Sequence, residues 1–580
     1  METYYTDERN MQMLIYLMKY HGIKKVIASP GSTNITFVAS IQQDPYFEIY
    51  SCVDERSAAY MACGMAADSG EPVALTCTGA TASRNYIPGL TEAYYRKLPI
   101  LAITATQHIG RIGHNVPQVI DRTNPLNDIC VYSATIQVIH DKEDEWAYST
   151  KINEALLELK HHGGGPVHLN MVTENSVVFD VKKLPITKVI DRITLEDQFP
   201  SIKDNRVGIF VGNHPNWDKQ LTTVVDQFCE QHNAVVICDH TSNYNGKYKV
   251  MGCLITAQKV YNSPLKYMDI LIDLGNVSGA SIALNPKEVW RINPDGKIRD
   301  RYKKMRYIFE MNEIQFFKYY INEKNNSVKC TYYEEWRNEY NKLLNNIPKD
   351  IPFSNIWIAK NTIKKLPENS KLHLGILNSL RAWNFFDKPD SIEVFSNTGG
   401  FGIDGVVSTF LGSSLVNPDT LYFCVVGDLA YFYDLNATGN RHRNNNLRIL
   451  VINNGKGTEF KNYNSNGAKF GEATDEYIAA ARHYGNQSKD LVRHYSQDLG
   501  FKYISATNKE EYLKNLNEFI NSEITDRSIL FEVFTHDGDE SNALYIMNHL
   551  ESDLKGNAKS IIKKAVGQKG INKIKKFIKG

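Results

Sequence analysis

The sequence predicts an α/β protein made of three doubly wound parallel-sheet domains. Short apolar runs that are typical of buried strands alternate with helical patterns, the order expected for parallel sheets with helices on both faces. With 580 residues the chain can form several hydrophobic cores, and its length suggests three or four domains. Its composition, 42% hydrophobic and 23% charged, is that of a soluble globular protein.

Four segments are predicted within this length. A first domain covers residues 1–185, a middle domain with a charged linker covers 186–350, a third domain covers 351–550, and a basic tail covers 551–580. The first and third domains are expected to be structural cousins.

Charge and cysteine usage exclude several classes of protein. A net charge of +1 gives no general attraction to nucleic acid. The nine cysteines form no C-x-x-C pair, and several lie inside apolar runs, which indicates buried free thiols in a reducing compartment. The N-terminus lacks the pattern of a signal peptide, and no apolar stretch approaches the length of a membrane span. We therefore expect a cytoplasmic protein.

The tail differs from the rest of the chain. Between residues 551 and 580 there are nine lysines and only two acids. Ile571, Ile574 and Ile578 follow helical spacing, with lysines opposite, so the pattern predicts a basic amphipathic helix that could contact an anionic membrane surface. A solvated terminal helix that packs weakly is the alternative.

Two hard oxygen donors follow two apolar runs in the third domain. The run 421–426 stops in Gly427 and Asp428, and the run 449–452 ends before Asn453, Asn454 and Gly455. Because the carboxyl ends of parallel strands form the ligand-binding edge of α/β sheets, Asp428 and Asn454 could hold one cation there. Oxygen donors of this kind suit Mg²⁺ together with phosphate. The plainer interpretation is two ordinary strand ends followed by polar turns.

A second group of motifs lies near the N-terminus. An apolar run over 26–28 enters a Ser-Pro-Gly-Ser turn at 29–32, and a later strand end is followed by Asp-Glu-Arg-Ser at 54–57 and a helix of small residues. A further run over 73–78 ends in Thr-Gly at 78–79, ahead of an Asn-Tyr-Ile-Pro segment at 85–88. These turns again place polar groups at the ends of strands.

In this order the segments resemble the pyrimidine-binding domain of thiamine diphosphate enzymes. The motifs, together with the Asn-Thr-Gly-Gly-Phe-Gly-Ile-Asp-Gly stretch at 397–405 and the Gly-Asp…Asn-Asn pair, are most similar to the SEPHCHC synthase (MenD) and acetolactate synthase-like decarboxylases and carboligases. The likeness covers both ends of the chain and is weaker in the middle. It implies a pyrimidine-binding first domain, a transhydrogenase-like middle domain, a diphosphate-binding third domain, and thiamine diphosphate with Mg²⁺ as cofactors.

The resemblance also implies roles for individual residues. Glu55 would hydrogen-bond the aminopyrimidine ring as the central catalytic group, although a surface ion pair with Arg56 is its plainer role. Asp428 and Asn454 would bind Mg²⁺ through their side chains, and Lys456 through its backbone carbonyl. Because the family's sites form between two chains, a homodimer or homotetramer is implied. The other implied cofactor-binding residues are Pro30, Gly31, Thr78, Asn85, Gly399, Gly400, Gly402, Ile403, Gly427, Leu429, Gly457 and Thr458.

The chain departs from SEPHCHC synthase, the menaquinone-pathway enzyme that it resembles, at the arginines with which that enzyme binds its substrates. Thr33, Gln107 and Thr398 stand where that enzyme has arginine, and a fourth arginine aligns near Trp383, with Arg381 close by. Because these arginines bind carboxylates in the family, the two dicarboxylate-type substrates of that reaction are disfavoured.

Other polar groups remain available for catalysis. Gln118 is shared with the family, whereas Gln107, His108 and His114 are new catalytic candidates. The alternative for the two histidines is that they are ordinary surface residues of a loop. The residues that we expect to bind substrate are Ser32, Thr33, Gln107, Gln118, Asn378, Ser379, Arg381 and Thr398.

The predicted function is decarboxylation of a pyruvate-like 2-oxo acid with transfer of the resulting acyl carbanion to an acceptor, such as a sugar or an aldehyde. Three alternatives stay open: a decarboxylase without ligation, a hydrolase of cyclic 1,2-diketones, and a catalytically inert scaffold. Small molecules and a second copy of the chain are the expected partners, with no nucleic acid.

Overall fold

The computed structural model describes residues 4–202, 206–215, 217–323, 331–483 and 488–551. Two compact units make up the chain: residues 1–198 with 296–310, and residues 199–295 with 311–580. The predicted basic helix around Ile571, Ile574 and Ile578 lies outside the described residues. Within them, no helix combines the length and the apolar character needed to cross a membrane.

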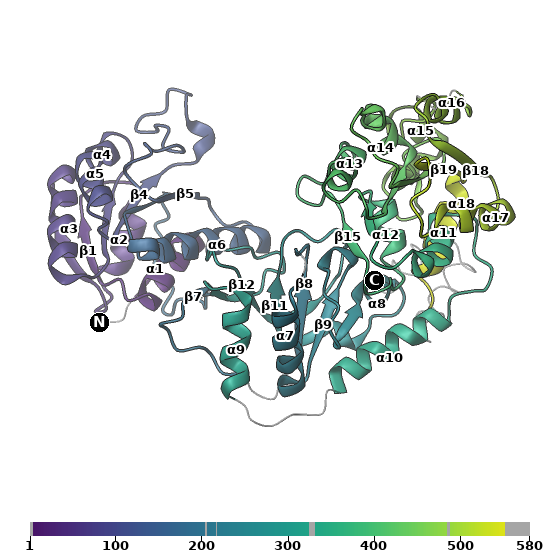
Figure 1. Cartoon of the computed structure of the whole chain (residues 1–580). Helices are drawn as coiled ribbons and strands as arrows, with labels where there is room; N and C mark the ends of the chain where they lie inside the picture. Colours follow the sequence, from purple (N-terminus) through teal and green to yellow (C-terminus); the bar gives the residue numbers. More distant parts are fainter. Residues whose placement is uncertain (1–3, 203–205, 216, 324–330, 484–487, 552–580) are drawn as a thin grey trace, which may run out of the picture. The chain divides into compact units, whose positions relative to one another are not determined.

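The first unit contains a six-stranded parallel sheet with the order β2-β1-β3-β4-β6-β5, coloured purple and blue in Figure 1. Its strands are β1 (Lys25–Ala28), β2 (Glu48–Ser51), β3 (Val73–Cys77), β4 (Ile100–Thr106), β5 (Tyr132–Ile136) and β6 (Val167–Val172). Its helices are α1 (Arg9–Tyr20), α2 (Ile35–Ile41), α3 (Glu55–Ser69), α4 (Thr81–Asn85), α5 (Ile87–Tyr95) and α6 (Lys142–Glu158).

Both faces of this sheet are covered, because successive residues of its central strands enter different cores. Ala74 and Leu101 pack in a cluster with α1, α2 and α6, whereas Leu75 and Ile100 pack in a second cluster with α3 and α5. Central strands buried on both faces read as continuous apolar runs, which is why their positions are visible in the sequence.

A second parallel sheet lies in the second unit, with the order β10-β9-β8-β11-β12. Its strands are β8 (Val207–Val211), β9 (Ala234–Cys238), β10 (Lys249–Met251), β11 (Tyr267–Leu274) and β12 (Asn285–Ile292), and its helices are α7 (Lys219–His232), α8 (Gly252–Ala257), α9 (Glu313–Glu323) and α10 (Thr331–Asn345). The strands β7 (Asp191–Ile193) and β13 (Met305–Phe309) pair in parallel within the first unit.

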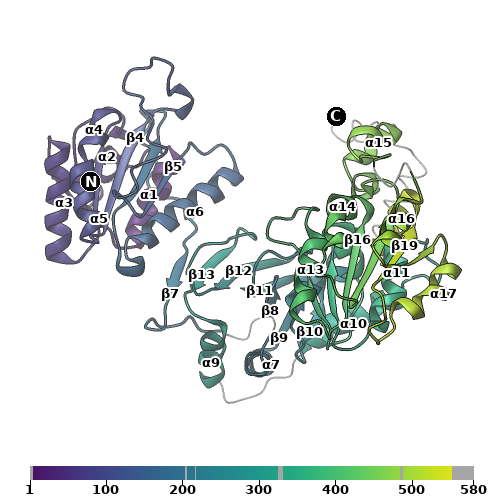
Figure 2. The ribbon, with the colours of Figure 1, turned by 45° about the horizontal axis from the view of Figure 1, so that its top comes forward.

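The third sheet also lies in the second unit, where it is the green and yellow part of Figure 2. Its order is β15-β14-β16-β17-β19-β18, with all neighbours parallel. The strands are β14 (Lys371–Leu374), β15 (Glu393–Phe395), β16 (Tyr422–Gly427), β17 (Leu447–Asn453), β18 (Lys502–Ala506) and β19 (Ile529–Phe534). The helices are α11 (Asn355–Thr362), α12 (Asn378–Trp383), α13 (Val406–Val416), α14 (Asp428–Tyr433), α15 (Thr474–Tyr477), α16 (Leu491–Asp498), α17 (Lys509–Phe519) and α18 (Asp537–Met547).

The first and third sheets share one topology. In each, the strands follow the order second, first, third, fourth, sixth and fifth along the chain. The third sheet is also covered on both faces: Cys424 faces the core under α13 and α14, and the neighbouring Phe423 packs on Phe519 of α17. The α/β class with three doubly wound parallel sheets is therefore confirmed.

Candidate active site

Two oxygen donors lie at the carboxyl ends of adjacent strands in the third sheet. β16 ends at Gly427, α14 begins at Asp428, and Asn454 directly follows β17. The two strands pair along their length, with Gly427 opposite Ile452. The fold thus brings Asp428 and Asn454 to one edge, the edge where parallel sheets bind ligands.

The side chains of this pair fit a hard cation. Asp428 is 2% exposed, and its Oδ2 accepts a hydrogen bond from the N–H of Gly455 at 2.9 Å. Asn454 donates its amide N–H to Thr458 Oγ1 at 3.3 Å, while its Oδ1 is buried and has no hydrogen-bond donor among the described residues. A buried oxygen without a donor costs free energy unless a cation or water meets it. Carboxylate and amide oxygens are ligands that Mg²⁺ prefers.

The loop after Asn454 closes around this edge. The ammonium of Lys456 lies 2.6 Å from Asp475 and 3.3 Å from Asp537, so these two acids hold the lysine side chain. A Cβ on Gly457 would lie 3.4 Å from Leu429 Cδ1. Leu429, Lys456 and Gly457, which the family likeness assigns to the cofactor and metal, are therefore neighbours of Asp428 and Asn454.

Open backbone marks the glycine-rich turn that precedes α13 and the last residue of β16. A Cβ added at Gly399, Gly400 or Gly427 would meet no described atom within 4 Å. Backbone N–H groups that no side chain covers can approach phosphate oxygens closely. These three positions suit a cradle for a diphosphate.

Three other residues of this turn, Thr398, Gly402 and Ile403, have close neighbours. Thr398 is 4% exposed, and its Cγ2 lies 3.2 Å from where a Cβ on Gly279 would stand. A Cβ on Gly402 would lie 2.3 Å from Asp404 Oδ1, and Ile403 is half-buried against the core beneath α13. Thr398 thus contributes packing at this point.

Arg381 is neutralised by an acid that the sequence analysis did not single out. Its two terminal nitrogens each donate to one carboxylate oxygen of Glu459 at 2.8 Å, and Nη1 also reaches Asn378 Oδ1 at 3.2 Å. Asn378 donates to Thr458 Oγ1 at 2.8 Å, and Ser379 is buried and accepts from a neighbouring asparagine amide. A bidentate Arg–Glu pair leaves little of this guanidinium for a substrate carboxylate.

Glu55 and Asn85 meet at the carboxyl edge of the first sheet. α3 begins at Glu55, and Asp54 caps the helix by accepting a hydrogen bond from the N–H of Ser57 at 3.1 Å. Asn85, the last residue of α4, donates to Glu55 Oε2 at 3.1 Å. This contact holds the Glu55 carboxylate in place, in preference to an ion pair with Arg56, which lies beside Asp54 instead.

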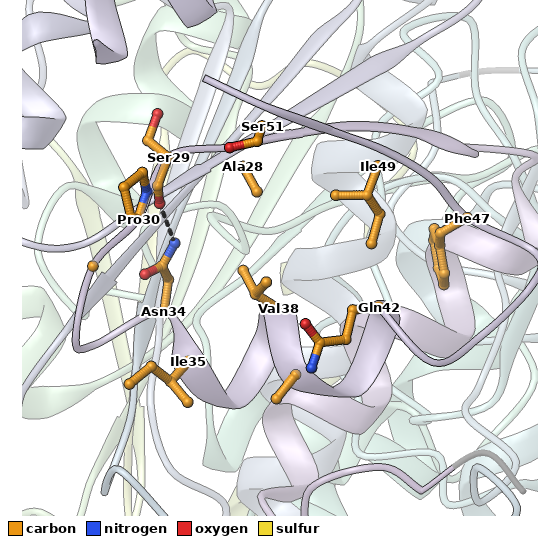
Figure 3. Close-up of a pocket in the computed structure, with 12 residues that line it drawn as sticks. Ala28, Ser29, Pro30, Asn34, Ile35, Val38, Gln42, Phe47, Ile49 and Ser51 are labelled. Carbon is orange, nitrogen blue, oxygen red and sulfur yellow. Dashed lines mark hydrogen bonds between the residues drawn. The ribbon is translucent and has the colours of Figure 1, made fainter. Parts of the chain in front are cut away.

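A cavity of about 620 Å³ opens beside the turn after β1 and is lined by β1, α2 and β2. Figure 3 shows Ser29, Pro30 and Asn34 at one end and Phe47 and Ile49 at the other, with Asn34 Nδ2 donating to the carbonyl of Ser29 at 3.0 Å. The atoms Ser29 Oγ and Asn34 Oδ1 are buried and make no hydrogen bond within the described part of the chain. This volume and mixed lining are those of a small-molecule site.

The turn itself is fixed by close packing against Thr78. A Cβ on Gly31 would lie 2.2 Å from Thr78 Cβ, so only glycine fits there. Thr33 is 5% exposed, and its Oγ1 bonds Thr78 Oγ1 at 2.8 Å and accepts from the N–H of Gly79 at 3.2 Å. Thr33 therefore braces the turn, whereas Ser32 beside it is exposed.

The segment after β4 carries the remaining predicted substrate groups. Gln107 Oε1 accepts a hydrogen bond from Arg111, and His108 Nδ1 accepts from the N–H of Gly110 at 3.0 Å. Gln118 is exposed and has a left-handed backbone with φ +62°, and His114 is also exposed. Arg111 was not singled out from the sequence, and its contact with Gln107 is the signal that identifies it.

A buried acid behind the Asp428 edge also escaped the sequence analysis. Glu540 accepts hydrogen bonds from the N–H of Asn355 at 3.0 and 3.1 Å and from Thr535 Oγ1 at 2.8 Å. Burial, together with the nearby charges of Asp539 and Asp428, raises the pKa of the Glu540 carboxyl to about 7. The Glu540 carboxyl therefore changes from neutral to charged as the pH rises through about 7.

Comparison with known proteins agrees with this geometry. Residues 9–124, which include Gly31, Glu55 and Asn85, match the N-terminal TPP binding domain of thiamine pyrophosphate enzymes. The 2-succinyl-5-enolpyruvyl-6-hydroxy-3-cyclohexene-1-carboxylate synthase of Bacteroides thetaiotaomicron is 30% identical over 571 residues, which cover 93% of this chain and 98% of the relative. The chain belongs to this family of thiamine diphosphate-dependent enzymes.

Synthases of the same name from two other bacteria are similar. That of Phocaeicola vulgatus is 30% identical over 553 residues, covering 92% of this chain and 96% of the relative. That of Bacteroides fragilis is 29% identical over 563 residues, covering 93% and 98%. As a family member, this SEPHCHC synthase-type enzyme uses thiamine diphosphate with Mg²⁺. When bound, the cofactor supplies a stabilised carbanion, and the protein supplies binding, orientation and proton transfer.

Proposed function

We propose that this enzyme decarboxylates a small 2-oxo acid and transfers the remaining acyl unit to an uncharged acceptor, such as a sugar or an aldehyde. In this proposal Asp428, Asn454 and the Lys456 carbonyl hold Mg²⁺ with the cofactor's diphosphate. The open turn at Gly399 and Gly400 receives the phosphate oxygens.

The observation that carries the substrate proposal is the absence of arginine at three positions where the family binds carboxylates. Thr33, Gln107 and Thr398 stand there, and Thr33 and Thr398 are buried in packing contacts. The nearby Arg381 is paired with Glu459 on both terminal nitrogens. Without bidentate guanidinium partners, two dicarboxylate-type substrates lose their strongest anchors, which favours a monocarboxylate donor and a neutral acceptor.

Arg111 supports a donor with a single carboxylate. It lies at the end of an exposed turn with its guanidinium bonded to Gln107, so the two side chains can present a cation and an amide together. We infer that this pair binds the carboxylate of the 2-oxo acid before carbon dioxide leaves.

Two residues are proposed to handle protons. Glu55, held by Asn85, shares a proton with the aminopyrimidine ring of the cofactor. His108 accepts a hydrogen bond at Nδ1 from Gly110, so its neutral form carries the proton on Nε2, where it can donate a hydrogen bond to a developing alkoxide. Gln118, exposed in the same segment, is proposed to orient the acceptor.

A homodimer or a larger homo-oligomer is the proposed active form. Glu55 belongs to the first unit and Asp428 to the second, and the family resemblance assigns both residues to one cofactor site. In the family that site forms between two chains. A monomeric variant that keeps both units folded but no longer binds the cofactor would support this assembly.

The test is carbon dioxide release from a panel of 2-oxo acids with Mg²⁺ and thiamine diphosphate, with and without sugar or aldehyde acceptors. The Glu55→Gln variant is the matched control, because it keeps the shape of the side chain and removes its charge. Release that rises with one uncharged acceptor, and that is absent in the variant, is the expected result. Carbon dioxide release that is independent of every acceptor would indicate a plain decarboxylase. Cleavage of a cyclic 1,2-diketone without carbon dioxide release would indicate the hydrolase.

The reaction that names the relatives is the second candidate, since the chain covers 98% of a synthase that is 30% identical. The same panel therefore includes 2-oxoglutarate with isochorismate as acceptor, the two substrates whose carboxylates the family's arginines bind. Efficient product formation from that pair would overturn the substrate argument drawn from Thr33, Gln107 and Thr398.

A further inference from the structure

A compact group of two histidines and a glutamate lies in the first unit and includes none of the residues assigned to the cofactor. His161 and His162 occupy the turn after α6, and Glu310 directly follows β13. The two imidazole rings stack with centroids 3.8 Å apart, and His162 has a left-handed backbone, with φ +49° and ψ +42°. This turn directs both rings toward the same carboxylate.

The distances match those between ligands of a single metal ion. His161 Nε2 lies 3.2 Å from Glu310 Oε2, and His162 Nε2 lies 2.8 Å from Glu310 Oε1. One donor atom from each of the three residues falls within 4.8 Å of the others. Ligands about 2.0–2.1 Å from a tetrahedral Zn²⁺ are themselves roughly 3.3 Å apart.

The hydrogen bonding of His161 calls for a cation between it and Glu310. The His161 side chain is 9% exposed, and its Nδ1 lies 2.9 and 3.0 Å from the two carboxylate oxygens of Glu158. If Nδ1 donates to Glu158, the neutral ring presents a bare lone pair at Nε2. That atom is buried, makes no hydrogen bond with any described residue, and faces the carboxylate of Glu310. A metal-bound imidazole has this arrangement, with its second nitrogen on a carboxylate.

The local charge also favours a divalent cation. Arg192 Nη2 donates to Glu158 at 2.8 Å, and Arg192 Nε lies 3.6 Å from Glu310. One guanidinium against two carboxylates leaves one negative charge for the cation to neutralise. Two imidazoles and one carboxylate suit Zn²⁺ and similar first-row ions better than Mg²⁺, which prefers oxygen ligands alone. His162 is 70% exposed, so water can complete the coordination.

We propose that His161, His162 and Glu310 bind one divalent transition-metal ion of the Zn²⁺ class, with Glu158 as a positioning residue that fixes His161. The ion fastens the turn after α6 to the end of β13 within the first unit. Close packing holds the carboxylate in place, because a Cβ on Gly296 would lie 2.7 Å from Glu310 Oε2.

The test is calorimetric titration of the full chain with Zn²⁺ in excess Mg²⁺, which fills the oxygen site at Asp428 and Asn454. Titration with Co²⁺ adds a visible absorption band that reports four-coordinate nitrogen and oxygen ligands. The parent is expected to bind one ion tightly, and His162→Ala and Glu310→Gln to weaken that binding by about 100-fold or more. His140→Ala, which removes another exposed histidine of the same unit, is the matched control and should bind as the parent does.

Thermal unfolding separates this site from a purely ionic cluster. Zn²⁺ is expected to raise the melting temperature of the parent and of His140→Ala but not of Glu310→Gln. Equal Zn²⁺ affinity in the parent and in His162→Ala, or a Glu310→Gln variant that loses stability while Zn²⁺ stabilises neither protein, would overturn the proposal. Glu158→Gln should weaken binding less than the loss of a ligand does.

Discussion

The buried carboxyl of Glu540 predicts a dependence of stability on pH that one substitution should remove. Its pKa is raised from an ordinary 4.5 to about 7 in the folded protein. A raised carboxyl pKa means that the folded state favours the protonated form. The contribution of the protonated Glu540 carboxyl to the free energy of unfolding is therefore fully present below pH 4.5. It is lost as the pH rises through 7. At about 1.4 kcal/mol per pKa unit, the loss between these limits is of the order of 3 kcal/mol.

The Glu540→Gln variant keeps an acceptor for the N–H of Asn355 and for Thr535 but cannot ionise. We expect its melting temperature to be close to that of the parent at pH 5, where most of the contribution remains, and to exceed it by a few degrees at pH 8, measured by calorimetry without Mg²⁺. Glu510→Gln, an exposed carboxyl on α17, is the control and should show the same difference at both pH values. A Glu540→Gln difference that does not change between pH 5 and pH 8 would refute the reasoning.

Three further predictions concern the cofactor site. Glu55→Gln should lower turnover by about 100-fold or more while calorimetry still detects cofactor binding, because only the proton-sharing group changes; unchanged turnover would remove Glu55 from the mechanism. Asn454→Ala should weaken Mg²⁺-dependent cofactor binding by at least about tenfold, since the buried side-chain oxygen proposed as a metal ligand is lost beside Asp428. Unchanged Mg²⁺ dependence would contradict the metal assignment. Gly31→Ala should lower the melting temperature, because its Cβ would lie 2.2 Å from that of Thr78, and an unaltered melting curve would count against this packing.

Strand ends and the motifs attached to them could be predicted from the sequence. Asp428 and Asn454 follow apolar runs that are buried on both faces of a sheet, so the positions where those runs stop are visible in the residue pattern. The family likeness names Glu55 and Asn85, in two short motifs, as cofactor-binding residues, and the structure adds the hydrogen bond between them.

Pairings between distant polar residues could not be predicted. Arg381 meets Glu459 across 78 positions, and Arg111 meets Gln107 only because a single helical turn folds back. Periodicity identifies the buried face of an element but does not identify which polar side chain reaches which partner. From the sequence Arg381 is a candidate substrate-binding residue, and the structure adds the acid that pairs with it.

The strand order shared by the first and third sheets has a consequence for synthesis on the ribosome. In each sheet the fifth strand, β5 or β18, is an edge strand whose paired neighbour in the described chain is the sixth, β6 or β19. The fifth strand therefore emerges before its partner has been translated, and at ordinary elongation rates the stretch from β18 to β19 takes roughly one to five seconds. Both fifth strands, β5 and β18, are less buried than the central β17, which is buried along its whole length. A weakly apolar fifth strand limits aggregation of the nascent chain during that interval.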